Sequence, residues 1–503
     1  MNLGIDLGSS NTLVATLTKD KTPIIIPDNL DKNAETTPSA IIIDNDKVIV
    51  GSLAKNIYQA YPDKYLYTFF KRHFGSYVPL GHTQQQLPIF SETLAAIMLK
   101  KVIYDAKLFI NEDIDKIVVT VPSHYNDLQR RSVIEAAKLA NIQLTSLLDE
   151  PIAAALYYIG ENKAVNQELI LIYDLGGGTF DLSVLTKNDE QIHVVAKGGI
   201  NDIGGEEFDQ IIVNKIKQVY FNTFGVAIKD SFYNNNLLKT LAEECKILIN
   251  QTNQGLEKWF YFDNRFFRVY FDIKEYNMFA LEIIKKTESC VRDTLKKLGL
   301  GISDINQLIL IGGASNSKLL YEYWQKQIKP SFQKIIYHQP LTSVSKGAAI
   351  YANSFANGQE SIKSSFNLKN VSSYNIAIKT KDSKEPELVI HKNTPLPVTG
   401  KKICQLDPKS RRTEFELCQY LDSKEYTQYL GVVSIEHATL GREVSIEIVL
   451  ENKIDGTVGI KVYNLHTGTP IKFDFINNVS EAKYDFTQQK SLLDSLFINN
   501  LVD

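Results

Sequence analysis

The chain has 503 residues, which is enough for more than one domain with a large buried core. A hydrophobic content of 44% and a charged content of 22% are typical of a globular protein, and a formal net charge of −3 argues against a nucleic-acid or membrane partner held by bulk electrostatics. The sequence shows no signal peptide and no apolar stretch long enough to span a bilayer, and its four cysteines have neither metal-ligand spacing nor the pattern of a disulfide framework. We therefore expect a cytoplasmic protein.

Strands that alternate with short helices are expected over residues 1–110, and the first pair of strands encloses a glycine turn. Asp6 ends the first strand of this pair. Lys71 comes later, beside an aromatic-rich run, and a lysine in such a place is by itself more typical of the surface than of a phosphate contact. The turn between the first two strands consists of Gly8, Ser9, Ser10 and Asn11.

An apolar strand over residues 117–121 ends at Pro122, and a helix that includes Arg130 is expected after it. Glu150 then precedes an alanine-rich helix. Taken alone, Glu150 is an ordinary acid of a first helical turn, where a negative charge is favourable.

A second glycine turn, within residues 168–185, is the centre of the sequence. A buried strand ends at Asp174, a second strand begins near Asp181, and three glycines with a threonine lie between them. Consecutive glycines let backbone N–H groups approach a bulky anion, and the two carboxylates could hold a divalent cation or a water. For this motif alone, an ordinary tight hairpin with exposed acids is the alternative. The turn consists of Gly176, Gly177, Gly178 and Thr179.

The two hairpins repeat one pattern, in which a strand, Asp-Leu-Gly, small or hydroxyl residues and a second strand follow each other. This repeat predicts two similar lobes that each offer a phosphate-binding turn to a shared cleft. A third turn, Gly312-Gly313, lies between a strand and a helix, which suits a nucleoside lying against a helix start. Three such turns in this order resemble the actin-like ATPase superfold, a two-lobed α/β fold.

The chain changes character after residue 356. The polar segment 357–370 is typical of an interdomain linker, and short alternating strands over 371–475 predict a β-sandwich domain. Residues 476–503 are expected to form a short C-terminal helical remnant. The predicted organisation is therefore an actin-like nucleotide-binding domain over 1–356, followed by these three segments.

Motifs over the whole chain to about residue 475 resemble the DnaK-type seventy-kilodalton heat-shock chaperones. The sequence looks closest to the HscC-type branch and lacks the family's helical lid. The resemblance implies ATP hydrolysis coupled to polypeptide binding, with ATP or ADP and Mg²⁺ as ligands and K⁺ as a further candidate. The motifs are GIDLGSSN at 4–11, FFKRHFG at 69–75, VTVPSHYNDLQR at 119–130, LLDEPIAAAL at 147–156, YDLGGGTFDLSVL at 173–185, IGGEEFD at 203–209, LIGGAS at 310–315 and KGAAI at 346–350.

The resemblance also implies roles for single residues. The first two glycine turns would bind phosphate, Asp6 and Asp174 would hold Mg²⁺ through its waters, and Asp181 would complete the acidic set. Lys71 would contact the γ-phosphate, and Glu150 would orient the attacking water, which suits a reaction that depends on positioning and charge neutralisation. The nucleoside would lie on Gly204, Gly205, Glu243, Lys246, Asn250, Gly312, Gly313 and Asn316.

Pro122 and Arg130 match the pair that relays the nucleotide state between the family's domains. The linker departs from the family's unbroken aliphatic run, because its apolar side chains, Phe366 and Leu368, alternate with polar residues, which should weaken its docking on the first domain. If the linker docks as an edge strand, period two puts both apolar side chains on one face, and coupling between the domains should depend on them.

Other positions depart from the family pattern. Asn316 replaces the arginine that stacks on adenine. Ser146 and Asp149 replace an arginine and an asparagine where J-domain co-chaperones dock, so a co-chaperone remains a candidate partner but docking of a standard J-protein is in doubt. The first peptide-binding loop, 379–387, is charged, and Thr413 occupies the central pocket position.

These features lead to three hypotheses. The first is a DnaK-type ATPase that couples its nucleotide state to an unfolded or specific client polypeptide. The alternative is a nucleotide-gated scaffold for one dedicated protein partner, which the altered loops favour. A sugar or metabolite kinase with the same cleft is the third, but the β-sandwich has no place in it.

Overall fold

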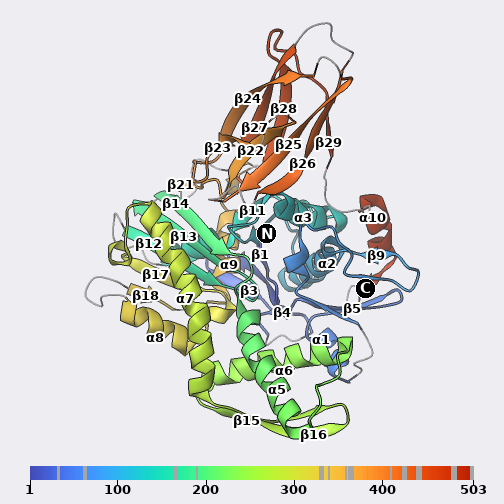
Figure 1. Ribbon diagram of the computed structural model, residues 1–503, viewed down its shortest axis with the longest axis vertical. Helices are drawn as coiled ribbons and strands as arrows, with labels where there is room; N and C mark the ends of the chain where they lie inside the picture. Colours follow the sequence, from blue (N-terminus) through green and yellow to red (C-terminus); the bar gives the residue numbers. More distant parts are fainter. Residues whose placement is uncertain are drawn as a thin grey trace.

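The computed structural model describes residues 1–30, 34–60, 65–161, 168–188, 191–327, 334–337, 340–356, 359–360, 367–381, 383, 385–407, 410–421, 427–437, 444–476 and 484–498. These residues form two α/β lobes and a β-sandwich, and the sandwich stands on one end of the two lobes (Figure 1).

The first lobe contains β1 (Asn2–Leu7), β2 (Asn11–Leu17), β3 (Pro23–Ile26), β4 (Thr37–Pro38), β5 (Ala40–Asp44), β6 (Lys47–Val50), α1 (Ser52–Ala60), β7 (Leu66–Thr68), the 3₁₀ turn η1 (Phe70–His73), β8 (Gly81–His82), β9 (Pro88–Ile89), α2 (Ser91–Ile110), β10 (Lys116–Val121), α3 (Asp127–Leu139) and β11 (Ser146–Asp149). Its main sheet has the order β11-β10-β1-β2-β3, with β4 beside β2. Side chains of α2 and α3 share one hydrophobic core with this sheet. Helix α2 has 20 residues, so the expectation of short helices alone in this region is wrong. Most of α2 is buried, which removes the one-sided apolar period that marks a surface helix.

The second lobe contains α4 (Glu150–Glu161), β12 (Glu168–Leu175), β13 (Phe180–Asn188), β14 (Gln191–Ile200), α5 (Gly205–Phe224), α6 (Phe232–Thr252), β15 (Leu256–Phe262), β16 (Arg265–Phe271), α7 (Ile273–Lys297), η2 (Ile302–Asp304), β17 (Gln307–Ile311), η3 (Gly313–Ser315), α8 (Lys318–Gln327), β18 (Lys334–Ile336), α9 (Ser343–Ala352), β19 (Phe355–Ala356) and β20 (Gln359–Glu360). Its main sheet has the order β18-β17-β12-β13-β14, and β21 (Asn367–Lys369) extends it. Strands β12 and β13 pair antiparallel around the second glycine turn, with Leu175 opposite Phe180.

The lobes meet where α9 packs against β1 and α4. A Cβ atom at Gly4 would lie 2.1 Å from the backbone nitrogen of Ala349, and one at Gly347 would lie 1.6 Å from the carbonyl oxygen of Ala153. Glycine is therefore required at both crossings. This close packing fixes the first and second glycine turns relative to each other.

The β-sandwich contains β22 (Asn375–Thr380), β23 (Glu387–Ile390), β24 (Val398–Leu406), β25 (Arg412–Tyr420), β26 (Gln428–Glu436), β27 (Val444–Asn452), β28 (Val458–Asn464) and β29 (Asp474–Ile476). One sheet has the order β23-β22-β25-β26-β29, and the other has the order β24-β27-β28. Apolar side chains from the facing sides of both sheets form the core between them.

The sandwich is docked on the lobes. Strand β21 pairs in parallel with β14, with Leu368 opposite Ile192, and Leu368 packs against the core of the second lobe while Lys369 is exposed. Leu128 of α3 joins the core of the sandwich. Phe366, the other apolar residue of the predicted linker, lies outside the described residues.

The C-terminal segment returns to the first lobe, where α10 (Phe486–Ser495) lies beside α2 and β9 (Figure 1). The helix predicted near the end of the chain stops at Ser495. The next residues form β30 (Phe497–Ile498), which pairs with β6.

Candidate nucleotide site

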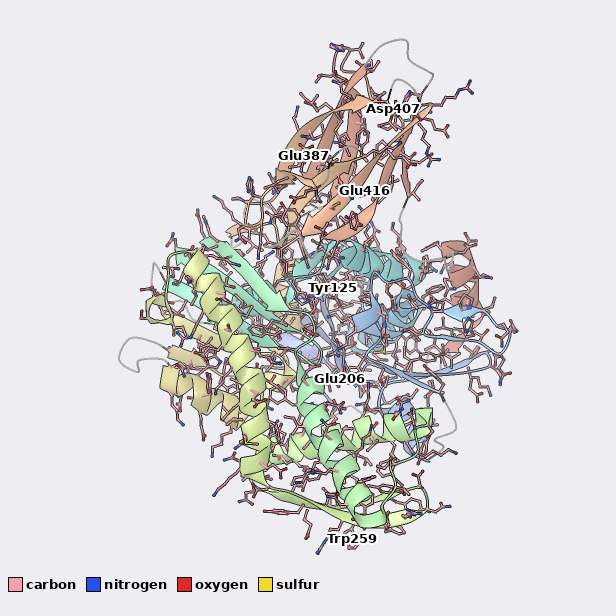
Figure 2. All side chains as sticks on the ribbon, viewed as in Figure 1. Tyr125, Glu206, Trp259, Glu387, Asp407 and Glu416 are labelled. Atoms are coloured by element: carbon pink, nitrogen blue, oxygen red, sulfur yellow. The ribbon has the colours of Figure 1, made fainter. Side chains whose placement is uncertain are left out.

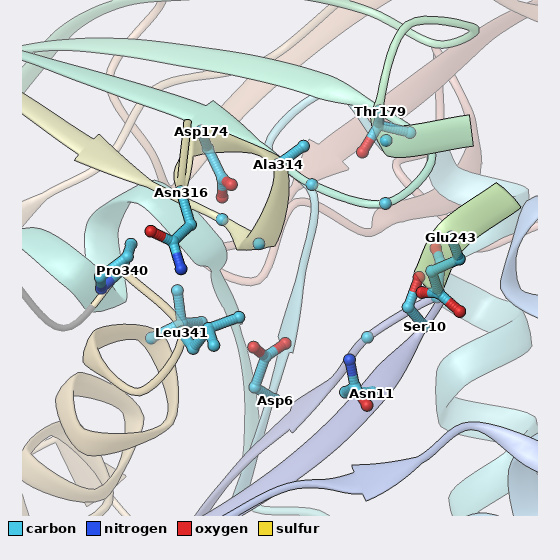
Figure 3. A pocket seen from close by; sticks show the side chains of 18 of the residues that line it. Asp6, Ser10, Asn11, Asp174, Thr179, Glu243, Ala314, Asn316, Pro340 and Leu341 are labelled. Carbon is cyan, nitrogen blue, oxygen red and sulfur yellow. The ribbon is translucent and has the colours of Figure 1, made fainter. Parts of the chain in front are cut away.

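The first two glycine turns face each other across a cavity of about 280 Å³ between the lobes (Figure 3). A Cβ atom at Gly177 would lie 2.4 Å from Ser10 Oγ, and one at Gly204 would lie 2.6 Å from the backbone nitrogen of Gly178. The two turns and the start of α5 therefore approach so closely that only glycine fits. The cavity wall is consequently rich in backbone groups.

Most of the predicted site residues line this cavity. Figure 3 shows Asp6 and Asn11 of the first lobe and Asp174 of the second turned toward the same space. Gly178, Gly204 and Asp181 are not part of its wall. The predicted residues that line it are Asp6, Gly8, Ser9, Ser10, Asn11, Lys71, Glu150, Asp174, Gly176, Gly177, Thr179, Gly205, Glu243, Lys246, Asn250, Gly312, Gly313 and Asn316.

Lys71 is buried in the cavity wall, with 4% of its surface exposed. It lies in η1, which follows Phe69 in the left-handed backbone conformation (φ 54°). Its Nζ donates a hydrogen bond of 2.6 Å to Glu150 Oε1. The surface position that the sequence alone favours is therefore wrong, because the glutamate stabilises the buried ammonium group. Burial opposes the charge of Lys71, but Glu150, Tyr125 and Asp6 together outweigh it and raise the pKa of the lysine.

Three carboxylates surround this lysine: Asp174 is buried, and Asp6 and Glu150 are partly buried. Burial raises the pKa of Asp6, and burial together with the neighbouring negative charges raises the pKa of Asp174 well above its ordinary value. Burial, Asp6 and Asp181 raise the pKa of Glu150 to about 7, against the opposing pull of Lys71. The site therefore holds more negative charge than the lysine balances, and a bound cation would reduce the repulsion between the carboxylates.

The donor set fits a hydrated cation. Within the described ranges, no group of three or more His, Cys, Asp or Glu side chains is arranged to hold a metal directly. Mg²⁺ usually keeps several of its waters and needs one or two carboxylates besides phosphate oxygens. Asp6 and Asp174, one from each lobe, suit that demand.

Asp181 is held by the segment that follows β10. Ser123 Oγ donates to its Oδ1 at 2.7 Å, the backbone N–H of His124 does so at 3.1 Å, and His124 Nδ1 lies 2.7 Å from the same oxygen. Burial opposes ionisation, but His124 and these hydrogen bonds outweigh it and lower the pKa of Asp181. Sequence reasoning misses Ser123 and His124, because nothing local links them to a strand far along the chain.

Sequence reasoning also misses Arg72. Its guanidinium donates to the carbonyl oxygen of Gly178 at 2.8 Å and forms an ion pair with Glu206 at the start of α5. It thereby ties the second glycine turn to α5. The signal in the sequence is a basic residue beside Lys71 and an acidic pair directly after Gly205.

The other end of the cavity has a mixed lining. Lys246 Nζ forms an ion pair with Asp209 at 2.8 Å and donates to the carbonyl oxygen of Gly205 at 3.2 Å. Asn316 Oδ1 accepts a hydrogen bond from the Tyr337 hydroxyl, and Asn316 and Leu341 both line this end of the cavity (Figure 3). The amide side chain of Asn316 therefore lies at the position where the family pattern has an arginine.

Charged residues also meet where the sandwich docks. Asp149 accepts from Arg130 Nη2 at 2.8 Å and from Lys197 Nζ at 2.6 Å. Burial opposes its ionisation, but the two cations outweigh it and lower the pKa of Asp149 to about 2. Arg130 also donates to the carbonyl oxygen of Asp455 in the sandwich at 2.9 Å, and Pro122 is buried at the start of this segment. The candidate relay residues thus lie between the cleft and the sandwich.

The loop end of the sandwich is polar. Thr413 Oγ1 accepts from the backbone of Asp407 at 2.9 Å and lies 2.8 Å from His437 Nε2. Glu387 and Glu416 lie on the faces of the sandwich (Figure 2), and Glu416 pairs with Lys379 at 3.3 Å. The predicted central pocket position, Thr413, is therefore occupied by a hydrogen-bonded polar side chain, and Lys379 of the charged first loop is ion-paired.

These features define an ATPase of the actin-like class. They are two lobes with opposed glycine turns, a buried lysine paired with a glutamate, and a cluster of carboxylates. A family model described as "Hsp70 protein" matches residues 2–91 and 80–472. The chain belongs to the Hsp70 family, and it is an ATPase and an ATP-dependent chaperone of the DnaK type, as the sequence predicts. The predicted fold class, an actin-like ATPase domain followed by a β-sandwich, is also confirmed.

Curated relatives cover most of the chain. A protein named "Chaperone protein DnaK" from Thermotoga neapolitana is 26% identical over 100% of this chain and 86% of its own length. Proteins of the same name from Halobacterium salinarum and Thermotoga petrophila are each 27% identical over 93% of this chain, and over 73% and 78% of their own lengths. The family binds ATP or ADP with Mg²⁺, and its DnaK-type members bind client polypeptides. The HscC-type likeness stays a prediction.

Among the residues that the structure describes, none of the helices is both long and apolar enough to cross a bilayer.

Proposed function

We propose that the cavity between the lobes is the ATP site and that its residues have the roles implied by their motifs. The first two glycine turns, 8–11 and 176–179, bind the phosphates through backbone N–H groups and the hydroxyls of Ser10 and Thr179. The nucleoside lies toward Gly312 and Asn316. One observation carries this proposal: the three glycine turns, although far apart in the sequence, line the same cavity.

Asp6 and Asp174 would hold Mg²⁺ through its waters. The ion would supply charge neutralisation for the phosphates, and the raised pKa values of these carboxyls support a demand for a cation. K⁺ is a further candidate for the same acidic site.

Lys71 and Glu150 carry the chemical step. Lys71 contacts the γ-phosphate, where negative charge develops, and Glu150 holds the attacking water by a hydrogen bond. Their contact of 2.6 Å keeps both groups in place before ATP arrives. Asp181, held by Ser123 and His124, completes the acidic set from the side of the sandwich.

The sandwich binds the polypeptide partner. The charged side chains of its first loop, 379–387, favour a client with charged side chains over a purely apolar segment. Asp149 is buried under Arg130 and Lys197, which is a further reason to doubt docking of a standard J-domain at this position. We propose a cytoplasmic protein that needs neither nucleic acid nor membrane.

The test is turnover by Glu150→Ala with Mg²⁺ and K⁺ present. We expect hydrolysis to slow while the affinity for Mg·ATP stays near that of the parent, because a carboxylate that positions water acts on the nucleophile. Glu243→Ala, which changes a cavity residue at the other end, is the matched control and should alter affinity instead. A Glu150→Ala variant that cannot bind Mg·ATP would make Glu150 a metal or structural residue.

A further inference from the structure

A second cavity, of about 380 Å³, lies where α7 and β14 of the second lobe meet the sandwich. Helix α7 runs along β14 (Figure 1). The helix approaches the strand closely, because a Cβ atom at Gly198 would lie 2.7 Å from Thr294 Oγ1. We call this space the basic cavity. Its wall includes Lys286, Asp293 and Lys297 of α7, Lys392 and Asn393 of the sandwich, and His124.

The wall of the basic cavity has an excess of positive charge. Among the described residues of this wall, the three lysines of α7 and the sandwich are set against a single acid, Asp293. A further lysine, Lys197, is balanced by Asp149, which lies 2.6 Å from its Nζ. Two positive charges are therefore in excess. A phosphate monoester carries about −1.5 to −2 charges at pH 7, so its charge matches this excess.

His124 contributes an unpartnered nitrogen to the same cavity. Its side chain is 5% exposed, and its Nδ1 lies 2.7 Å from Asp181 Oδ1. Burial opposes the ionisation of Asp181, but His124 and the hydrogen bond from Ser123 lower its pKa, so this carboxylate accepts and Nδ1 carries the proton. His124 Nε2, on the opposite side of the ring, is buried and has no hydrogen-bond partner among the described residues. Such a nitrogen is costly unless a bound group satisfies it.

Asn393 contributes a second unpartnered atom, from the loop between β23 and β24. The loop is held in place, because the backbone N–H of Asn393 donates to the carbonyl oxygen of Ser372 at 2.8 Å and that of Lys392 donates to Asn375 Oδ1 at 2.9 Å. Asn393 Oδ1 is buried, and no described residue donates to it. An O–H group can donate to this oxygen, and it can serve His124 Nε2 whether that nitrogen accepts or donates.

We propose that the basic cavity binds a small phosphate ester that carries hydroxyl groups. The phosphate lies among the lysines, which hold it by charge-assisted hydrogen bonds, and the hydroxyl groups reach His124 Nε2 and Asn393 Oδ1. A volume of about 380 Å³ suits a ligand of this kind. The site is separate from the ATP cleft, because the two cavities share none of their described lining residues.

A ligand in the basic cavity would contact both the second lobe and the sandwich. It would also contact His124, which holds Asp181 beside the ATP cleft. We therefore expect bound ligand to change the rate of ATP hydrolysis. That consequence rests on the proposed function of the cleft, whereas binding of the phosphate ester does not.

The experiment is isothermal titration calorimetry of the full-length protein loaded with Mg·ADP, which occupies the ATP cleft. The probe is glycerol 3-phosphate. It is compared with glycerol, which lacks the phosphate, with glycerate, which has a carboxylate instead, and with inorganic phosphate. The lysine variant is Lys286→Ala with Lys297→Ala. The matched control is Lys285→Ala with Lys296→Ala, which removes two exposed charges of the same helix that do not line the cavity.

We expect glycerol 3-phosphate to bind at one site per chain, and to bind more tightly than the three comparison compounds. The lysine variant should weaken binding roughly tenfold or more, because hydrogen bonds to charged groups are strong. The matched control should stay within about twofold of the parent, because exposed charges outside a site contribute little. A parent that fails to bind millimolar glycerol 3-phosphate would overturn the proposal, as would equal weakening by the two double variants.

Asn393→Gly tests the hydroxyl contacts. Asn393 has a left-handed backbone (φ 63°), which glycine adopts freely, so the change removes the amide oxygen without backbone strain. We expect the affinity for glycerol 3-phosphate to fall about threefold, as for the loss of a neutral hydrogen bond. An unchanged affinity would mean that the ligand does not reach Asn393, and the proposal of a hydroxylated ligand would be wrong.

Lys71→Ala tests where the phosphate is bound. This change lies in the ATP cleft, so binding of glycerol 3-phosphate to the basic cavity should stay as in the parent. If Lys71→Ala abolishes binding and the lysine variant does not, the phosphate occupies the cleft and the proposal is wrong. Because the measured quantity is binding and not hydrolysis, these outcomes do not depend on which residues hydrolyse ATP.

Discussion

The ATP cleft and the docking face of the sandwich both bury charged residues, but they balance the charge differently. In the cleft, Asp6, Glu150 and Asp174 surround Lys71. Burial raises the pKa of each carboxyl, and neighbouring carboxylates raise those of Glu150 and Asp174 further. At the docking face, two cations hold Asp149, and its pKa is lowered to about 2.

This difference separates a binding site from a structural contact. A buried charge cluster that is fully paired needs nothing more and holds two parts of a protein together, whereas an unbalanced one is stable only when a ligand supplies the missing charge. We propose that the chain uses one arrangement for the nucleotide and the other for the interface; the two lie on either side of the segment from Pro122 to Arg130.

The largest expected effect compares two Asp→Asn changes. Asp149→Asn leaves Arg130 and Lys197 buried without their partner and should cost about 3–5 kcal/mol of the free energy of unfolding. Asp174→Asn removes a crowded charge, so the metal-free protein should be as stable as the parent or more stable. Urea unfolding without Mg²⁺ or nucleotide measures both. Equal losses from the two substitutions would erase the distinction between the two clusters.

The next effect concerns catalysis in the cleft. Lys71→Ala should leave nucleotide binding largely intact and slow turnover by roughly 10²–10³, because the lysine acts where charge develops in the transition state. Single-turnover hydrolysis and nucleotide affinity are measured together, with Lys55→Ala, a partly exposed lysine paired with Glu243, as the control. Turnover within about threefold of the parent would place Lys71 away from the reacting phosphate.

A smaller effect is expected from the linker. Leu368 packs on the second lobe next to Ile192, and burial of such a side chain contributes about 1.5–3 kcal/mol. Leu368→Ser should weaken coupling, so that ATP turnover responds less to an added peptide while nucleotide affinity stays the same. Lys369→Ser, at the exposed neighbouring position, should change nothing. An identical peptide response from the parent and the Leu368 variant would exclude the linker as a coupling element.

The smallest effect is the dependence of stability on pH. The pKa of Glu150 is raised from 4.5 to about 7, so its contribution is fully present below pH 4.5 and is lost as pH rises through 7. The pKa of Asp149 is lowered from 3.8 to about 2, so its contribution is present above pH 3.8 and is lost as pH falls toward 2. The two clusters should therefore fail at opposite ends of the pH range.

Thermal melting of the metal-free protein between pH 5 and pH 8 checks the first of these limits. We expect the midpoint to fall as pH rises and Glu150→Gln to reduce the slope. A residual slope should remain, because burial and Glu92 raise the pKa of Glu135 in the first lobe to about 7 as well. A slope that Glu150→Gln leaves unchanged would mean that Glu150 is not part of an unbalanced cluster.

The sequence determines much of this protein by itself. The three glycine turns, the strands that precede them and the alternating pattern of the sandwich are local features, and each is present where the sequence predicts it. Glycines that border a strand and apolar residues with a fixed period carry information within a few residues. The two-lobed ATPase with a β-sandwich follows from them.

The tertiary structure decides what depends on distant partners. Lys71 is buried because η1 turns it toward Glu150, and Asp181 is held by His124, which lies 57 residues earlier in the chain. The return of α10 to the first lobe has no local signal either, because its amphipathic pattern specifies a helix and not the surface that the helix covers. Local pattern fixes which face of an element is apolar, but only the packing of the whole chain determines which other element meets that face and which charges are brought together.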